Sequence, residues 1–139
     1  MHLHRLTPLA KVPGIHWFSL QKGESAGQKS FWPVPLTDWT AELHDFTDTA
    51  ALVAHLDLVL AVDTAVVHLA GAMGKPVLLL LREESGMFWL RGRADSPWYP
   101  RMRLLRQQHS GDWAPVLAAA RDWVERAAAQ GAAAVIPAG

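Results

Sequence analysis

The sequence predicts an α/β domain built on an open, mostly parallel sheet that is flanked by helices. Two continuous apolar runs, residues 58–62 and 76–81, are typical of strands that are buried on both faces of a parallel sheet. The stretch between them, residues 64–73, is followed by Gly74 and Pro76 and therefore predicts the connecting helix. The two strands should be adjacent, parallel and central in the sheet.

The N-terminal part predicts less regular structure. Residues 4–12 favour a short helix, which Pro8 limits to a turn or two. The aromatic and β-branched run at residues 15–20 predicts a buried strand, and residues 36–43 predict a second, weaker one. The polar residues 21–35 between them predict a long loop, and long ordered loops are usually functional or mobile.

Capping residues mark two helices in the middle of the chain. Thr47 and Asp48 are good N-cap types ahead of a short helix at residues 50–56. Asp63 has the same position ahead of the helix expected at residues 64–73. Both helices are therefore expected to begin at a side-chain cap.

The C-terminal part alternates irregular and regular segments. Residues 82–101 contain several glycines and prolines and predict irregular structure, whereas residues 102–106 suit an edge strand. Asp112 should cap a last helix, whose apolar positions follow helical spacing. These positions are Trp113, Val116, Leu117, Ala120, Val124 and Ala127. We expect one domain over residues 1–130 and a frayed small-residue tail over residues 131–139.

Composition excludes several classes of protein. The chain has 139 residues, half of them hydrophobic, and its 13 basic and 13 acidic side chains cancel. This length suits one domain, and a zero net charge argues against a nucleic-acid or anionic-membrane binder. Without cysteine there is no disulfide, thiolate nucleophile or zinc–cysteine site. No apolar run approaches a membrane span and the N-terminus has no signal-peptide pattern, so we expect a cytoplasmic protein.

The turn between the first central strand and its helix is the best candidate site. Asp63 and Thr64 end the strand, and the amides of the following helix N-terminus are a ready anion site. The Thr64 hydroxyl lies at that end, and His68, four residues on, lies on the same helix face. A diphosphate could therefore meet amides, hydroxyl and imidazole together. The alternative that these residues only cap the helix explains the pattern equally well.

Lys22 is a second candidate contact for phosphate. It follows the strand expected at residues 15–20, beside Gly23, and so lies at the carboxyl end where such sheets bind ligands. A lysine taken alone is more often a solvated surface residue. Its expected convergence with Thr64 at one sheet edge favours a binding role. No Gly-x-Gly-x-x-Gly or Gly-Lys-Ser/Thr loop is present, which excludes the common dinucleotide and P-loop sites.

Seven tryptophans are many for a chain of this length. Those expected in the core are Trp17, Trp113 and Trp123. The others fall in predicted loops or at strand margins, namely Trp32, Trp39, Trp89 and Trp98. There an indole can stack on a base or sugar, although packing in a core or subunit interface is commoner. His2 and His4 suggest a frayed terminus rather than a metal pair, because no carboxylate cluster accompanies them. No metal site is expected.

Several segments resemble one family when they are taken in order. They are residues 19–23, 45–50, 57–77, 95–104 and 111–113. Together they resemble the C-terminal half of bacterial glycosyltransferases related to the lipopolysaccharide heptosyltransferases (glycosyltransferase family 9). Many such proteins carry tetratricopeptide repeats upstream, and more distantly they resemble the O-GlcNAc transferases. The resemblance covers roughly residues 13–128.

The resemblance implies a fold and a set of ligand contacts. The family has the GT-B architecture of two Rossmann-like lobes, of which the C-terminal lobe holds the nucleotide-sugar donor. Lys22 would contact the donor diphosphate, while Asp63, Thr64 and Ala65 would line it at the helix N-terminus. His68 would lie near the phosphate or ribose. The donor would be a substrate, with no bound metal and no further cofactor. Catalytic residues are not assigned.

Departures from the family shape the functional expectation. The acceptor-binding N-terminal lobe is absent, Ala65 stands where heptosyltransferases tend to have Gly, and residues 82–88 differ from the repeat-bearing relatives. We expect a donor-binding lobe that is inactive alone and that forms a homo-oligomer or meets a missing lobe. One alternative is a non-catalytic binding or interaction module. Another is an unrelated small α/β enzyme that uses His68 and Asp63 as an acid–base pair.

Overall fold

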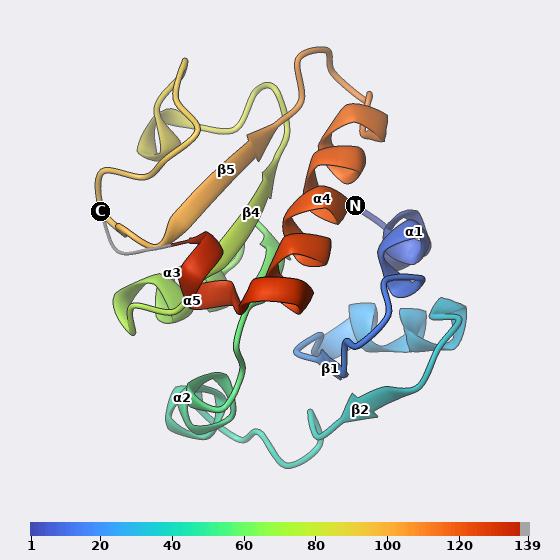
Figure 1. Ribbon diagram of the computed structural model, residues 1–139. Coiled ribbons are helices and arrows are strands. Elements are labelled where there is room, and N and C mark those ends of the chain that lie inside the picture. The colour runs from blue at the N-terminus through green and yellow to red at the C-terminus, as the bar shows by residue number, and fades with distance from the viewer. Residues whose placement is uncertain (137–139) are drawn as a thin grey trace.

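The protein has an α/β fold, and its computed structural model describes residues 1–136. The main sheet has three strands in the order β3-β4-β5, and both pairings are parallel. These strands are β3 (Val59–Val62), β4 (Val77–Leu81) and β5 (Met102–Arg106). Helices cover both faces of the sheet (Figure 1). The predicted open, mostly parallel architecture is therefore confirmed.

The predicted unit of strand, helix and strand is confirmed with one correction. β3 and β4 are adjacent and parallel, with Val59 opposite Val77, and α3 (Ala65–Ala72) connects them. The expectation that β3 is central is wrong, because β3 forms an edge of the three-stranded sheet. β1 (Trp17–Ser19) pairs instead with β2 (Leu36–Asp38) in a separate parallel sheet. β4 alone is buried along its whole length.

Alternate residues of β4 point to opposite faces of the sheet and divide the core in two. Leu79 and Leu81 belong to the cluster on the α3 side, which also contains Trp89. Leu78 and Leu80 belong to the cluster formed with α1 (Thr7–Ala10) and α4 (Ala114–Gln130). Figure 1 shows α4 crossing one face of the main sheet, while α1 lies beside it. Both faces of β4 are therefore covered, as its continuous apolar run predicts.

The last long helix follows the predicted apolar spacing. Its buried residues are Val116, Ala120 and Val124, one above another on the face toward the sheet. The N-cap of α4 is Trp113 rather than the expected Asp112, and its side chain makes no capping hydrogen bond. Asp112, one residue upstream, accepts a hydrogen bond from Ala114 N through its Oδ1 at 3.2 Å. β5 is an edge strand, as expected.

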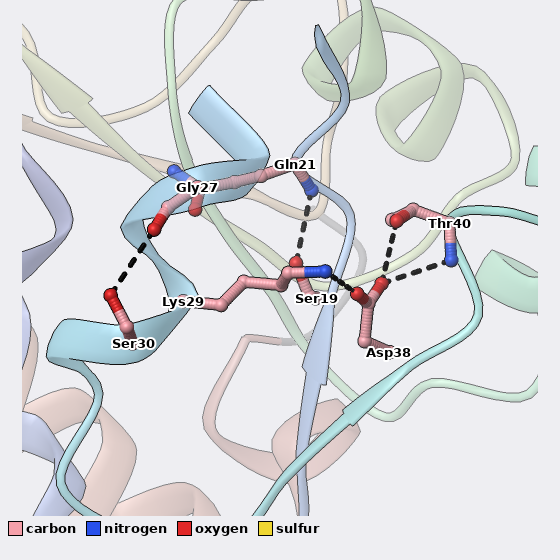
Figure 2. A network of polar contacts seen from close by, with 7 residues as sticks. All are labelled: Ser19, Gln21, Gly27, Lys29, Ser30, Asp38 and Thr40. Atoms are coloured by element: carbon pink, nitrogen blue, oxygen red, sulfur yellow. Dashed lines mark hydrogen bonds and ion pairs between the residues drawn. The ribbon is translucent and has the colours of Figure 1, made fainter. Parts of the chain in front are cut away.

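The segment over residues 21–35 is not a loop but is largely η2 (Gly23–Phe31), a 3-10 helix. Gly23 begins it with a φ of 66°, a left-handed conformation that suits glycine. Figure 2 shows how Lys29 from this helix reaches Asp38 at the end of β2. The ion pair joins this polar helix to the small sheet. The sequence of the segment has no periodicity that predicts the helix or the ion pair.

Asp38 is the centre of this polar network. Besides Lys29 it accepts hydrogen bonds from Thr40, at 3.0 Å from the backbone N and 2.6 Å from the hydroxyl (Figure 2). These donors, Lys29 first, lower the pKa of the Asp38 carboxyl from 3.8 to about 2. Nearby, Gln21 N donates to Ser19 Oγ at 3.3 Å. The network fixes the carboxyl ends of β1 and β2.

The helix expected at residues 50–56 is α2 (Phe46–Ala54), and its cap is not one of the two predicted residues. Asp45 is the N-cap, because its Oδ1 accepts a hydrogen bond from Asp48 N at 2.9 Å. Asp48 Oδ2 in turn accepts from His44 N at 2.8 Å. The helix therefore begins upstream of the predicted start. The Asp48 carboxylate accepts a hydrogen bond from the backbone before the helix and does not cap a helix that starts after it.

The remaining elements are short. η1 (Leu3–Leu6) precedes α1, η3 (Met87–Trp89) lies within the irregular region, and α5 (Ala132–Val135) follows α4. The expectation of a frayed tail is wrong as far as Ile136, which is 1% exposed and packs in the α4-side core. Residues 137–139 lie outside the described part of the chain. Within residues 1–136, no helix has the length and apolarity to cross a membrane.

Candidate functional site

The candidate site lies where β3 ends and α3 begins. Asp63, Thr64 and Ala65 are exposed there. Thr64 occupies the N-cap position with extended backbone (φ −147°, ψ 166°), but no side chain makes a capping hydrogen bond. The expectation that Asp63 caps this helix is therefore wrong. The capping alternative fails as well, since the Thr64 hydroxyl and the first amides of α3 are not engaged with each other.

His68 lies one turn into α3 and is half-exposed. Its Nδ1 is 3.1 Å from the hydroxyl oxygen of Tyr99, within hydrogen-bond distance. Its Nε2 is 3.9 Å from Asp63 Oδ1, which is too far for a hydrogen bond. His68 and Asp63 are thus neighbours, as their spacing predicts, but they do not form a hydrogen-bonded acid–base pair.

Aromatic rings hold the imidazole of His68 on several sides. Trp89 stacks beside it, with ring centroids 5.1 Å apart and an interplanar angle of 23°. Phe88 meets it edge-on at 5.0 Å. Trp89 is 1% exposed and its ring is part of the α3-side core, so packing in the core, the commoner use of a tryptophan, is confirmed for this residue. Phe88 and Trp98 remain exposed and pack on each other.

Tyr99 is the functional candidate that sequence reasoning missed. Ser96 Oγ, which is buried, accepts hydrogen bonds from the backbone N of Trp98 and of Tyr99 at 3.2 and 3.3 Å. This turn directs the Tyr99 ring against Gly71 of α3. The signals available were weak: Tyr99 is the single tyrosine of the chain and lies within the segment 95–104.

Arg106 holds the segment that carries Phe88 and Trp89. From the end of β5 its guanidinium donates to the carbonyl oxygens of Ser85 and Leu90, at 3.0 and 2.7 Å. Desolvation by burial, with a smaller contribution from Arg91, lowers the pKa of Arg106. Its two terminal nitrogens donate to backbone carbonyls, whereas its buried Nε has no hydrogen-bond partner within the described residues. We therefore assign Arg106 a structural role beside the site.

Lys22 follows a strand of the small sheet, whereas α3 begins at the end of a strand of the main sheet. The strand before Lys22 is β1, and the Lys22 Nζ donates to the carbonyl oxygen of Leu43. Within residues 1–136 it makes no direct hydrogen bond to Asp63, Thr64 or His68. The structure brings together Asp63, Thr64, Ala65 and His68 but does not engage Lys22 with them. Its contact with a ligand stays a prediction.

The other candidates are the N-terminal histidines and the remaining tryptophans. Across the described chain, no group of three or more His, Cys, Asp or Glu side chains is arranged to hold a metal ion. The His2 and His4 Nδ1 atoms lie 2.7 Å apart, and His2 packs against Phe31. The tryptophans expected in the core are half-buried rather than fully buried; these are Trp17, Trp113 and Trp123. Trp32 packs edge-on against Trp17, whereas Trp39 is exposed.

Comparisons with known proteins give the site a context. The sequence profile of glycosyltransferase family 9 (heptosyltransferase) matches residues 41–112, which include β3, α3 and Tyr99. The chain is 33% identical over 124 residues to Protein FlbA of Caulobacter vibrioides, an alignment that covers 82% of this chain. It spans about a fifth of the length of that relative, 20%. No solved structure matches the chain.

Proposed function

We propose, from the premise that the chain belongs to glycosyltransferase family 9 (heptosyltransferase), that it is a nucleotide-sugar binding lobe. The donor diphosphate would lie at the N-terminus of α3. Thr64 and the amides that begin with Ala65 would contact its oxygens, and His68 would lie beside it. The donor is a substrate, so this function requires no metal or further cofactor.

The observation that carries this proposal is the uncapped start of α3. Thr64 and Asp63 have the residue types that usually cap a helix, yet neither side chain does so. A helix N-terminus with free amides attracts anions through its dipole and its N–H groups. During sugar transfer the diphosphate leaves with increasing negative charge, and preorganised donors of this kind stabilise such charge.

The finer assignment within the family is also part of the proposal. We propose a GT-B arrangement in which a second lobe, not contained in residues 1–139, holds the acceptor and its base. A link to tetratricopeptide repeats or to an O-GlcNAc-transferase-like type rests on the resemblance of the segments 19–23, 45–50, 57–77, 95–104 and 111–113 taken together. Action in the cytoplasm likewise stays a prediction.

Calorimetric titration tests the donor site. The wild-type chain should bind UDP, ADP or GDP weakly, and Thr64→Val should reduce that affinity by removing the hydroxyl. Thr47→Val is the matched control, because Thr47 is exposed on α2, away from this helix start. Absence of heat with all three nucleotides, or equal losses in both variants, would contradict the donor-site proposal.

An interaction module is the second candidate, and one observation favours it. Four large apolar side chains near the site are exposed, Met87 at 92% and Trp98 at 56%, together with Phe88 and Leu90. Contiguous exposed apolar surface commonly binds a partner. We propose that this surface meets a second lobe or a second copy of the chain. Light scattering of wild type and Met87→Glu tests self-association, which the charged variant should reduce.

A further inference from the structure

We propose that Tyr99 is a positioning residue that orients His68 and fixes its tautomer, so that His68 offers an Nε2–H donor to an oxygen of the diphosphate. The part of this inference that concerns the ligand rests on the proposed function above. The part that concerns the imidazole itself does not, because the contact between Tyr99 and His68 exists without a ligand.

The orientation of the imidazole follows from its neighbours. The Trp89 ring lies along one face of it, and Phe88 and Tyr99 meet it edge-on. The 3.1 Å contact with the Tyr99 hydroxyl occupies Nδ1. Nε2 is therefore the nitrogen that remains for a ligand, on the side of Asp63 and the start of α3.

The choice of tautomer follows from one charge, the Asp63 carboxylate, and one hydroxyl, that of Tyr99. A neutral imidazole has one N–H donor and one acceptor nitrogen. The Asp63 carboxylate, 3.9 Å from Nε2, favours the proton on that nitrogen. The Tyr99 hydroxyl then donates to the lone pair of Nδ1. In the opposite tautomer, a lone pair of Nε2 would face the diphosphate in place of an N–H donor, so the tautomer decides whether His68 helps or opposes binding.

The Tyr99 hydroxyl is held in place independently of His68. Ser96 Oγ accepts from the Tyr99 backbone, and the Tyr99 ring rests on Gly71. Within the described residues, the hydroxyl makes its side-chain hydrogen bond to His68. Tyr99→Phe therefore removes the contact to Nδ1 and retains the ring packing, which separates the positioning role from a structural one.

Nitrogen NMR of the unliganded chain tests the imidazole directly. With ¹⁵N-labelled histidine at pH 8.5, where imidazoles are ordinarily neutral, His68→Gln identifies the His68 signals among the seven histidines. We expect wild-type His68 to carry its proton on Nε2. Tyr99→Phe should move the Nδ1 resonance and increase the Nδ1–H form, and Trp39→Phe, whose ring packs against Phe18, should change neither. A wild-type Nδ1–H form, or an Nδ1 resonance unmoved in Tyr99→Phe, would overturn the inference.

Affinity for inorganic pyrophosphate and for UDP tests the consequence. Tyr99→Phe should weaken binding about three- to tenfold, the range expected for one hydrogen bond. His68→Gln keeps an amide N–H near the position of Nε2 and should bind better than His68→Asn. In the His68→Gln background Tyr99→Phe should have no further effect. An equal loss there would show that Tyr99 acts without His68. Wild type that binds neither probe would contradict the proposed function, while the NMR result would still decide the role of Tyr99.

Discussion

The ring of Tyr99 lies directly against Gly71 of α3. A Cβ placed at Gly71 would stand 2.6 Å from the Tyr99 Cγ and within 2.9 Å of two further ring atoms. Glycine is therefore required here by a close approach, since its backbone is ordinary helix. This contact joins α3, which begins at the candidate site, to the segment over residues 95–104.

Gly71→Ala should destabilise the fold, although alanine is the better helix former. Helix propensity favours alanine by about 1 kcal/mol, whereas overpacking against an aromatic ring costs about 1–3 kcal/mol. The difference is about 0–2 kcal/mol, and we expect a net loss of about 1 kcal/mol in urea unfolding. Gly27→Ala is the control, because a Cβ there meets nothing within 4 Å. A Gly71→Ala chain as stable as wild type would show that the ring yields without cost.

Lys22→Ala should weaken nucleoside diphosphate binding, but by less than the residue types alone suggest. A charged hydrogen bond contributes about 1.5–3 kcal/mol. Lys22 Nζ already donates one of its three N–H groups to the Leu43 carbonyl, which restricts its approach to a phosphate. We therefore expect a loss near the lower end of this range, about tenfold in affinity. Calorimetry with UDP measures it, and Lys11→Ala, another exposed lysine, is the control. Binding of the free nucleoside should be unchanged. Equal UDP affinity in wild type and Lys22→Ala would remove Lys22 from the site.

The ion pair of Asp38 should give the fold a dependence on acid pH. The pKa of Asp38 is lowered in the folded state from 3.8 to about 2, chiefly by Lys29. Its contribution to stability is therefore complete above pH 3.8 and is lost as the pH falls through about 2. Lys29→Met should raise the pKa of Asp38 toward 3.8.

Carboxyl ¹³C NMR measures the titration of Asp38 in both chains. Arg121→Met, which breaks the exposed pair between Arg121 and Glu125 on α4, should leave the Asp38 midpoint where it is. A wild-type midpoint near 3.8 would show that Lys29 does not pair with Asp38 in solution.

The central part of the fold follows from local sequence pattern. β4 is buried on both faces, as the uninterrupted apolar run from Val77 to Leu81 predicts. Gly74, which has a φ of 69°, and Pro76 mark the end of α3 in the same local way. The edge position of β3 could not be predicted, because it depends on whether β1 pairs with β3 or with β2, a long-range choice.

The part of the site that depends on local sequence was predictable, and the part that depends on long-range contacts was not. Thr64 and His68 are four residues apart on one helix, so their proximity follows from helix geometry. The Tyr99 hydroxyl reaches His68 from 31 residues away, and Trp89 reaches it from the intervening region. Those contacts depend on the hydrogen bonds by which Ser96 and Arg106 hold the irregular segments in place, and these bonds have no local sequence pattern. The position of Lys22 could not be predicted, because it directly precedes η2 and the sequence of η2 has no helical periodicity. The ion pair between η2 and Asp38 is not visible in the sequence either.

Sugar transfer should require more than residues 1–139, even if this chain binds the donor. Donor contacts from Thr64 and the α3 amides need nothing from another lobe. Transfer also requires an acceptor held in line with the sugar carbon and a base to deprotonate it. Positioning of this kind contributes about 7–11 kcal/mol and general base catalysis about 10²- to 10⁴-fold in rate. We expect the purified chain to bind UDP-, ADP- or GDP-linked sugars without releasing the nucleoside diphosphate to an added acceptor. Release above the rate of spontaneous hydrolysis, abolished by Thr64→Val, would overturn the need for a second lobe, because it would place the complete reaction at the start of α3.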